Sequence, residues 1–383
     1  MAEKLRIVFA GGGTAGHLYP ALNLAQIFEK LWQCEFLFFG TLKGIESTKV
    51  PQRGYKLILL SVRGFHRRFS FENFLFPFRL ISSLNKSRIV LKKFKPHFVV
   101  GTGGYVMGPV LKVAAKLKIP VFIQEQNSFP GVTTRMLSKQ ASAVFVAYEE
   151  AKKFLDKSTN TIKAGNPVLF QESKKDRDEI VKSFGLDPLK KTILVFGGSQ
   201  GAASINRALS TILLEKQLPQ DVQLLWQTGK LQYQEYMNWS DGRKFSNVVI
   251  TPFIDDMWSA YSISEFCICR AGAMSLSELA IAGLPAILIP LKSAAGNHQY
   301  KNAKSLEERG CAKVLTDDEN LAENLFKTLL TWLKENDKIV AMQSIFKSIA
   351  QADAGTFIVN EIHKNLIDKN MWPEAAHTER DGK

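Results

Sequence analysis

The sequence predicts an α/β protein made of two Rossmann-like domains, each built on a parallel sheet. At 383 residues, the chain is too long for one ordinary hydrophobic core and suits two domains of the usual size. An apolar run followed by a glycine-rich turn and a helix occurs at the start of the chain and again halfway along it. Because loops at the carboxyl ends of parallel strands bind ligands, we expect a cleft between the two domains.

The first of these units begins with the apolar run Leu5 to Ala10 and continues in G-x-G-x-x-G spacing from Gly11 to Gly16. Pro20 suits the first turn of a helix that runs to about Leu31. A dinucleotide site also needs an acid at the end of the next strand, which instead ends at Gly40-Thr41. We therefore expect these glycines to let backbone amides approach another phosphate or a sugar.

Two further strands in the first half end in polar or glycine-rich turns. His97 to Gly101 precedes Gly103-Gly104-Tyr105 and a helix over 109–117, and Val121 to Ile123 precedes the run 124–127, QEQN. Parallel strands present their carboxyl ends at one edge of the sheet. That edge is expected to collect Thr14, His17, Tyr105, Glu125 and Asn127.

His17 is the best candidate for a general base. An imidazole near a helix N-terminus loses affinity for its proton and stays neutral, as a base that takes a hydroxyl proton must. A histidine that is merely hydrogen-bonded in its loop is the alternative. Glu125 could orient or assist His17, or could bond to nearby backbone.

The second half repeats the pattern twice. Thr192 to Phe196 leads into the glycine turn 197–201 and a helix from Ala202. Phe266 to Cys269 leads through small residues into a helix over 274–282 that ends at Gly283, and a strand over 286–291 follows. The start of such a helix is an anion-binding site.

Glu278 lies one turn into that helix, where its carboxylate could accept both hydroxyls of a ribose. Alternatively, Ser275 and Glu278 form a capping box that only satisfies backbone amides. His298 and Gln299 follow the next strand and offer neutral polar groups suited to a sugar. The pair Asp255-Asp256 is not a metal motif and fits a helix N-terminus, so we expect no metal.

Composition limits the class of protein. Hydrophobic residues make up 45% of the chain, no apolar stretch reaches the roughly 18 to 20 residues of a membrane span, and we expect no signal peptide. The four cysteines lack metal-ligand spacing and are expected to be reduced thiols in a cytosolic protein. The net charge of +14 suits phosphorylated ligands, nucleic acid or an anionic membrane.

The segment 63–95 carries much of this charge, with nine Lys or Arg, one acid and seven phenylalanines. We expect it to touch an anionic membrane surface, with aromatic rings among acyl chains and cations on headgroups. A core helix with a basic outer face is the alternative, and nucleic acid is disfavoured because no RNP, KH or zinc pattern accompanies the segment. The expected membrane contacts are Arg67, Arg68, Phe69, Phe71, Phe74, Phe76, Phe78 and Arg79.

Taken together, the motifs GGGTAGH, GTGGY, EQN, GGSQGA with Asn206, and CRAGA through NHQYKNA closely resemble those of the MurG family. These are the bacterial UDP-N-acetylglucosamine:lipid I N-acetylglucosaminyltransferases of peptidoglycan synthesis, which serve cell wall biogenesis, cell shape and cell division. The resemblance covers about residues 5 to 310. It implies a GT-B fold with an acceptor and membrane-facing domain over 1–164, a UDP-sugar domain over 165–349, a returning helix at about 350–368 and a polar tail over 370–383.

The resemblance also implies the reaction. N-acetylglucosamine would pass from UDP-N-acetylglucosamine to the C4 hydroxyl of lipid I, an undecaprenyl-diphosphate-linked muramoyl peptide, with inversion and without an obligatory cofactor. The protein would be peripheral on the cytoplasmic face of the inner membrane. His17 would be the base, assisted by Glu125, and the acceptor would meet Gly13, Gly103, Gly104 and Tyr105.

By the same resemblance, each part of the donor has its own contacts. Glu278 would hold the uridine ribose, Ile254 would offer backbone to uracil, and Gln299 would reach the sugar. The full expected donor set is Thr14, Ala15, Gly16, Asn127, Ser199, Ile254, Ala273, Met274, Ser275, Glu278, His298 and Gln299.

The chain departs from the family pattern at five positions. The family usually has glycine, histidine, asparagine, arginine and aspartate where this chain has Ala15, Gln124, Thr134, Leu169 and Gly296. Without a guanidinium at 169, the donor's charge would be met by Arg270 or by amides alone. Two alternatives therefore remain: another GT-B enzyme, such as a UDP-sugar epimerase or a diacylglycerol glucosyltransferase, or a catalytically lapsed UDP-sugar or lipid binder.

Overall fold

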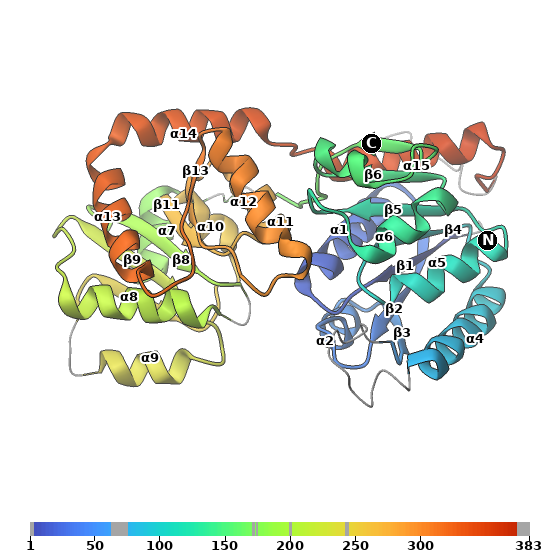
Figure 1. The fold of residues 1–383 in the computed structure, drawn as a ribbon, viewed down its shortest axis with the longest axis horizontal. Coiled ribbons are helices and arrows are strands. Elements are labelled where there is room, and N and C mark those ends of the chain that lie inside the picture. The colour runs from blue at the N-terminus through green and yellow to red at the C-terminus, as the bar shows by residue number, and fades with distance from the viewer. Residues whose placement is uncertain are drawn as a thin grey trace. The chain divides into compact units, whose positions relative to one another are not determined.

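The computed structural model describes residues 4–62, 76–170, 173, 175–198, 201–241 and 245–373, which form two compact units (Figure 1). The first unit contains residues up to Leu169 and the returning segment from Ala352, and the second runs from Phe170 to Gln351. The boundaries expected from sequence lay at 164 and 349.

The first unit has a seven-stranded sheet in the order β3-β2-β1-β4-β5-β6-β7, in which every pair is parallel. Strand order reverses between β1 and β4, and ligands bind at such a switch point in open α/β sheets. The elements are β1 Leu5–Gly11, α1 Ala15–Leu31, β2 Cys34–Thr41, α2 Glu46–Gln52, β3 Lys56–Leu60, α4 Phe76–Phe94, β4 Phe98–Gly103, α5 Met107–Lys116, β5 Val121–Glu125, α6 Val132–Leu137, η1 Ser138–Gln140, β6 Ala143–Val146, η2 Glu149–Phe154, β7 Thr161–Lys163 and α15 Ala354–Asp368.

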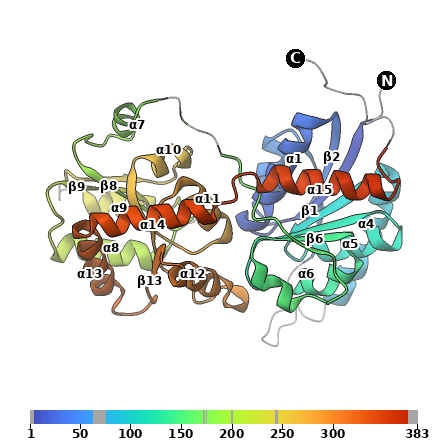
Figure 2. The same cartoon turned by 90° about the horizontal axis from the view of Figure 1, so that it is seen from above.

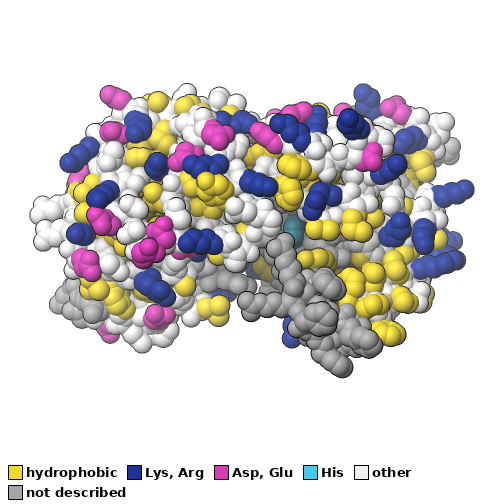
Figure 3. All heavy atoms as spheres, viewed as in Figure 1, with side chains coloured by type: hydrophobic (Ala, Val, Ile, Leu, Met, Phe, Trp, Pro, Cys, Tyr) yellow, Lys and Arg dark blue, Asp and Glu magenta, His cyan; other side chains and the backbone are white. Residues whose placement is uncertain are grey.

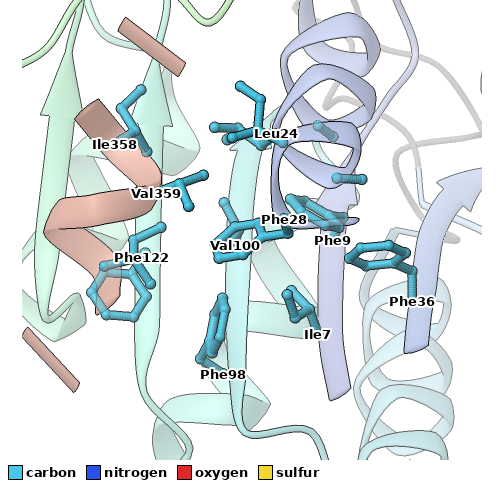
Figure 4. Packing of buried hydrophobic residues seen from close by; sticks show 14 of the residues in the cluster. Ile7, Phe9, Leu24, Phe28, Phe36, Phe98, Val100, Phe122, Ile358 and Val359 are labelled. Carbon is cyan, nitrogen blue, oxygen red and sulfur yellow. The ribbon is translucent and has the colours of Figure 1, made fainter. Parts of the chain in front are cut away.

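The core of this unit lies on both faces of the sheet, because alternate residues of each strand point to opposite sides. Ile7 and Phe9 of β1 pack on the face covered by α1 and α15, while Val8 and Ala10 pack on the other face. Figure 4 shows Ile358 and Val359 of α15 beside Phe122 and Val100, within the same cluster as Ile7 and Phe9. The amphipathic helix near the C-terminus therefore completes the core of the first unit (Figure 2).

The second unit has a six-stranded parallel sheet in the order β10-β9-β8-β11-β12-β13, with its switch point between β8 and β11. Cys267 and Cys269 lie on one face of β11, with their sulfurs 3.9 Å apart. The elements are α7 Arg177–Ser183, β8 Lys191–Phe196, α8 Ala203–Glu215, β9 Val222–Gln227, α9 Tyr233–Ser240, β10 Val248–Thr251, α10 Met257–Ser262, β11 Ser264–Cys269, α11 Ala273–Ala282, β12 Ala286–Leu288, η3 Ala295–Asn297, α12 His298–Glu308, β13 Ala312–Val314, α13 Leu321–Lys334 and α14 Asn336–Ile349.

Two local predictions were wrong. Pro20 is not in the first turn, because α1 begins at Ala15, where the amides of His17 and Leu18 already bond to Thr14. The strand expected over 286–291 ends at Leu288, although the Ile289 amide still bonds to Cys269. Pro290 follows and has no N–H to continue the ladder.

Candidate functional site

The His17 ring lies against the glycine turn at the end of β4. A Cβ atom on Gly103 would lie 2.5 Å from His17 Cδ2, so only glycine lets β4 come this close. His17 Nδ1 lies 3.3 Å from the Gly12 carbonyl oxygen and 3.2 Å from Thr14 Oγ1. Because a carbonyl oxygen only accepts, the first contact is a hydrogen bond when Nδ1 carries the proton, which makes Nε2 the basic nitrogen.

Glu125 is buried and organises the loop that follows β5. Its Oε1 accepts from the Asn127 amide and side chain at 3.1 and 3.2 Å, and its Oε2 accepts from Gly131 N and Thr134 Oγ1 at 3.0 and 2.7 Å. These contacts hold Asn127 at the same sheet edge as His17. The sequence left two roles for Glu125: to orient or assist His17, or to bond to nearby backbone. The structure shows hydrogen bonds to the backbone amides of Asn127 and Gly131, and the catalytic role of Glu125 stays a prediction.

Gln124, which stands where the family usually has histidine, is buried among amides. Its Nε2 donates to Asn166 Oδ1 at 2.9 Å, its Oε1 accepts from Gln126, and Asn166 Nδ2 donates to the Gln126 carbonyl. Gln124 therefore joins β5 to the turn at Asn166. Nearby, Thr134 replaces the usual asparagine and supplies a hydroxyl to Glu125.

Sequence reasoning missed Glu46, which lies beneath the first glycine loop. The Gly13 amide donates to Glu46 Oε1 and Oε2 at 3.0 and 2.9 Å, and the Thr41 amide and hydroxyl both donate to Oε1 at 2.7 Å. The Gly13 amide is therefore directed at a carboxylate of the chain itself and not at a bound phosphate. The one signal in the sequence was an acid at the start of a helix next to the strand end Gly40-Thr41.

In the second unit, Glu278 faces a buried tyrosine. The N-cap residue of α11 is Gly272, which has no side chain to accept from the first helical amides. Ser275 is not the N-cap, so the alternative of a capping box formed by Ser275 and Glu278 is wrong. Instead, the Tyr261 hydroxyl donates to Glu278 Oε2 at 2.8 Å, and Oε1 accepts no hydrogen bond from the described residues. Burial raises the pKa of Glu278 to about 7, and the Tyr261 hydrogen bond opposes that rise.

The first turn of α11 is the anion-binding end of this unit. The Leu276 amide donates to the Gly272 carbonyl at 3.0 Å, and Ala273, Met274 and Ser275 form the turn that precedes this hydrogen bond. Aligned peptide dipoles add positive potential there. The helix ends at Gly283 in the left-handed conformation, as predicted.

Gln227 at the end of β9 connects two loops of the expected donor site. Its Oε1 accepts from the Ile254 amide at 2.8 Å, and its Nε2 donates to the Gly198 carbonyl at 3.1 Å. Of Ile254's backbone polar groups, only the carbonyl then remains to meet uracil. Gln227 is buried and had no motif that would mark it in the sequence.

Gln299 lies in the first turn of α12, and its Oε1 accepts from the Leu291 amide at 3.0 Å. This contact leaves the Gln299 NH₂ group to donate to a ligand. His298 begins the helix after Gly296 and Asn297, which both have positive φ. At a φ of 63°, glycine is favoured over the aspartate usual in the family.

Arg270 is held by its own unit. Its Nη1 donates to Asp317 Oδ2 at 2.8 Å and to the Ile289 carbonyl at 3.0 Å, and its Nη2 donates to Ser204 Oγ at 2.9 Å. The guanidinium thus has an internal counter-ion.

Asp256 is the N-cap of α10, where its carboxylate accepts from the Ser259 amide at 3.0 Å. The sequence predicted that the pair Asp255-Asp256 lies at a helix N-terminus, and the structure confirms this for Asp256.

The outer face of α4 is apolar and basic. Ser83, Ser87 and Leu91 form its buried face, whereas Phe78, Ile81 and Ile89 on the opposite side are 65%, 56% and 69% exposed. The helix contains no acid, and Lys86, Arg88, Lys92 and Lys93 flank the exposed apolar side chains. Figure 3 shows hydrophobic side chains next to Lys and Arg at the margin of the first unit where α4 lies.

Several expected site residues lie outside the described residues: Ser199, Arg67, Arg68, Phe69, Phe71 and Phe74. Ala15 and Gly16 begin α1, Tyr105 is exposed after β4, and Phe76 and Arg79 lie in the first turn of α4. None of the helices in the described ranges has the length and hydropathy of a membrane-spanning segment.

Two doubly wound parallel-sheet units, each with glycine turns and helix starts at its switch point, form the GT-B fold, which GT-B glycosyltransferases share. Residues 7–146 match the glycosyltransferase family 28 N-terminal domain, and residues 192–356 match the family 28 C-terminal domain. The chain belongs to this family and, within it, to the MurG family.

The relatives support this assignment over nearly the whole chain. The UDP-N-acetylglucosamine--N-acetylmuramyl-(pentapeptide) pyrophosphoryl-undecaprenol N-acetylglucosamine transferase of Christiangramia forsetii is 42% identical, over 96% of this chain and 100% of its own length. The protein of the same name from Parabacteroides distasonis is 40% identical over the same shares. The crystal structure of Acinetobacter baumannii MurG matches with a TM-score of 0.73 at 28% identity, over 94% of this chain and all of that one.

The same fold occurs in a different enzyme class. A putative UDP-N-acetylglucosamine 2-epimerase from Listeria monocytogenes matches with a TM-score of 0.68 over 97% of this chain and 99% of that one. At 13% identity, this likeness concerns the fold alone.

Proposed function

We infer that this chain transfers N-acetylglucosamine from UDP-N-acetylglucosamine to lipid I and so forms lipid II in peptidoglycan synthesis. The observation that carries this inference is the roughly 40% identity, over nearly the whole length, with proteins named for this activity. The chain also retains His17, Glu278 and Gln299 in the places that the family pattern gives them.

The second unit holds the donor in this proposal. A carboxylate that accepts two ribose hydroxyls suits Glu278, because its Oε1 accepts no hydrogen bond from the described residues and Tyr261 fixes its Oε2. The amides at the start of α11 stabilise the charge that develops on the departing diphosphate. Gln299, fixed through its carbonyl oxygen, donates its NH₂ group to a sugar hydroxyl.

The first unit holds the acceptor and the base. His17 takes the proton of the attacking C4 hydroxyl through Nε2, while Nδ1 bonds to the Gly12 carbonyl. Glu125 keeps Asn127 at this edge, and Tyr105, which follows β4, is exposed. Attack opposite to the leaving group inverts the anomeric carbon, and one base is sufficient for such a transfer.

The membrane surface supplies the acceptor in this proposal. The outer face of α4 matches an interfacial helix, because exposed Phe78, Ile81 and Ile89 can enter the acyl region while flanking cations meet anionic headgroups. We propose on this basis a peripheral protein on the cytoplasmic face of the inner membrane, where it would meet the undecaprenyl-linked acceptor.

One experiment separates this activity from the alternatives. The purified protein is incubated with UDP-N-acetylglucosamine, with and without a lipid I analogue. Release of UDP that requires the acceptor, together with a disaccharide product, is the expected result. Isomerisation of the sugar without acceptor would indicate an epimerase, and donor binding without any turnover would indicate a lapsed binder.

A further inference from the structure

Glu46 is a fully buried carboxylate at the start of α2, next to the first glycine loop. Among the described residues it forms no ion pair, so hydrogen bonds must stabilise its charge. It receives them from the Gly13 amide and from the amide and hydroxyl of Thr41, at 2.7 to 3.0 Å. The start of a helix adds favourable potential for a negative charge.

Three glycines make room for this carboxyl group. A Cβ atom on Gly12, Gly40 or Gly44 would collide with Glu46 side-chain atoms. These glycines come from the loop after β1 and from the end of β2 and the turn that follows it. Glycines at the ends of two neighbouring strands therefore leave space for one carboxyl group. The capping of a short helix does not require such an arrangement.

Glu46 is connected to His17 through a single peptide unit. The Gly13 amide that donates to Glu46 belongs to the same peptide group as the Gly12 carbonyl, which lies 3.3 Å from His17 Nδ1. A carboxylate that accepts from the N–H polarises the carbonyl of that peptide and fixes its direction. A Cβ atom on Gly104 would collide with the Gly12 carbonyl, so the β4 turn also packs on this oxygen.

We propose that Glu46 is a positioning residue for transfer: through the Gly12–Gly13 peptide it holds His17 with Nδ1 protonated and Nε2 basic. This proposal rests on the proposed role of His17 as the base. It also gives the first glycine loop a purpose other than anion binding, because the Gly13 amide donates to Glu46.

The test is a double-mutant cycle between Glu46→Gln and His17→Ala, measured as kcat and KM with UDP-N-acetylglucosamine and a lipid I analogue. Glutamine keeps the shape, but its NH₂ group faces N–H and O–H donors. We expect Glu46→Gln alone to lower kcat roughly ten- to hundredfold with KM for the donor nearly unchanged, because the base is misplaced. In the His17→Ala background, the same change should lower kcat less than about twofold.

Asp156→Asn is the matched control. Asp156 lies in the same unit and also accepts from a backbone amide and a hydroxyl, those of Ser158, at 2.8 and 2.6 Å. We expect this change to leave kcat unaltered in both backgrounds. If Glu46→Gln does not fold, as judged by thermal melting, Thr41→Val takes its place, since it removes one donor to Glu46 and keeps the charge.

The outcomes separate the two assignments. If the kcat losses of Glu46→Gln and His17→Ala multiply, Glu46 supports the fold and does not act through His17, and the positioning role is rejected while the base remains. If His17→Ala turns over at the full rate, the base assignment fails and the positioning role fails with it. Coupled losses, with Thr41→Val showing a smaller loss that also disappears in the His17→Ala background, support the proposal.

Discussion

The Tyr261 hydroxyl donates a hydrogen bond of 2.8 Å to Glu278 Oε2, and this pair lies at the centre of the proposed donor site. Burial raises the pKa of Glu278 to about 7, while the hydrogen bond favours the ionised form. Burial also raises the pKa of Tyr261 well above its usual value, so the tyrosine stays protonated and can donate. A carboxylate meant for a ribose is thus only partly ionised at neutral pH in the unliganded protein.

Donor affinity should therefore depend on pH. Only the ionised Glu278 accepts from both ribose hydroxyls, so we expect the Kd for UDP-N-acetylglucosamine to rise up to about tenfold for each pH unit below 7. Calorimetric titration from pH 8.5 to 5.5 measures this, and the donor's diphosphate diester does not titrate in that range. Glu278→Gln is expected to bind weakly with no such dependence, and a constant Kd for the unaltered protein would exclude Glu278 as the ribose ligand.

Tyr261→Phe should move the midpoint of this pH dependence upwards. The substitution removes the hydrogen bond that favours the ionised carboxyl group, so the pKa of Glu278 rises further. The same titration series on this variant gives the shift directly. A midpoint at or below that of the unaltered protein contradicts the expected contribution of the Tyr261 hydroxyl.

Glu278→Gln should stabilise the fold in alkaline solution although it weakens donor binding. The pKa of Glu278 rises from 4.5 to about 7 on folding, so its ionisation lowers stability progressively as pH rises from 4.5 through 7. Because Glu278 is partly accessible to solvent, which screens this effect, we expect the free energy of unfolding to fall by about 2 kcal/mol at pH 8.5. Urea unfolding should show the gain for Glu278→Gln at pH 8.5 and little difference at pH 4.5, and an equal gain at both would point to another cause.

His17→Ala should lower kcat by about two orders of magnitude and keep donor affinity nearly unchanged, in line with the usual contribution of a general base. His17 belongs to the first unit, whereas the donor contacts proposed here lie mainly in the second. Steady-state turnover and the Kd for UDP-N-acetylglucosamine report the two effects separately. Full turnover in this variant would remove His17 from the mechanism.

The outer face of α4 should bind anionic vesicles. Replacing its three exposed large hydrophobic residues by serine is expected to reduce cosedimentation with phosphatidylglycerol vesicles at least tenfold, because their burial among acyl chains is lost. Binding should also weaken between 50 and 500 mM salt. The three changes are Phe78→Ser, Ile81→Ser and Ile89→Ser.

The control for α4 uses the second unit, where Leu189, Leu214 and Val340 are also exposed, Leu214 to 54% and Val340 to 62%. Replacing these three by serine should leave vesicle binding unchanged. Equal losses from both triple variants would mean that general hydrophobicity, and not α4, drives the association.

The glycine loops show where sequence reasoning succeeds and where it stops. Apolar runs followed by glycine turns predicted which strand ends carry ligand-facing loops in both sheets. The start of α11 was predicted to within one residue. The partner of the first loop was not foreseen, because Glu46 lies 33 residues from Gly13 in the chain. A side chain that meets a loop across neighbouring strands leaves no local pattern.

The departures from the family pattern show the same limit. From sequence, Gln124 stood where the family usually has histidine, and the donor's charge was expected to be met by Arg270 or by amides alone. In the structure, Gln124 is buried among the amides of Gln126 and Asn166, and Arg270 is paired with Asp317. Asn166 lies 42 residues from Gln124 and Asp317 lies 47 residues from Arg270, and spacing along the chain does not reveal such distant partners.

The sequence by itself determined the two-part α/β fold and the family, because apolar periodicity and glycine turns are local and the motifs recur in fixed order. The tertiary structure decided which polar groups meet. It placed Tyr261 on Glu278, Gln227 between two loops and Glu46 beneath the first glycine turn. Those contacts arise where parallel strands distant in the chain end side by side, so they exist only once the sheets have formed.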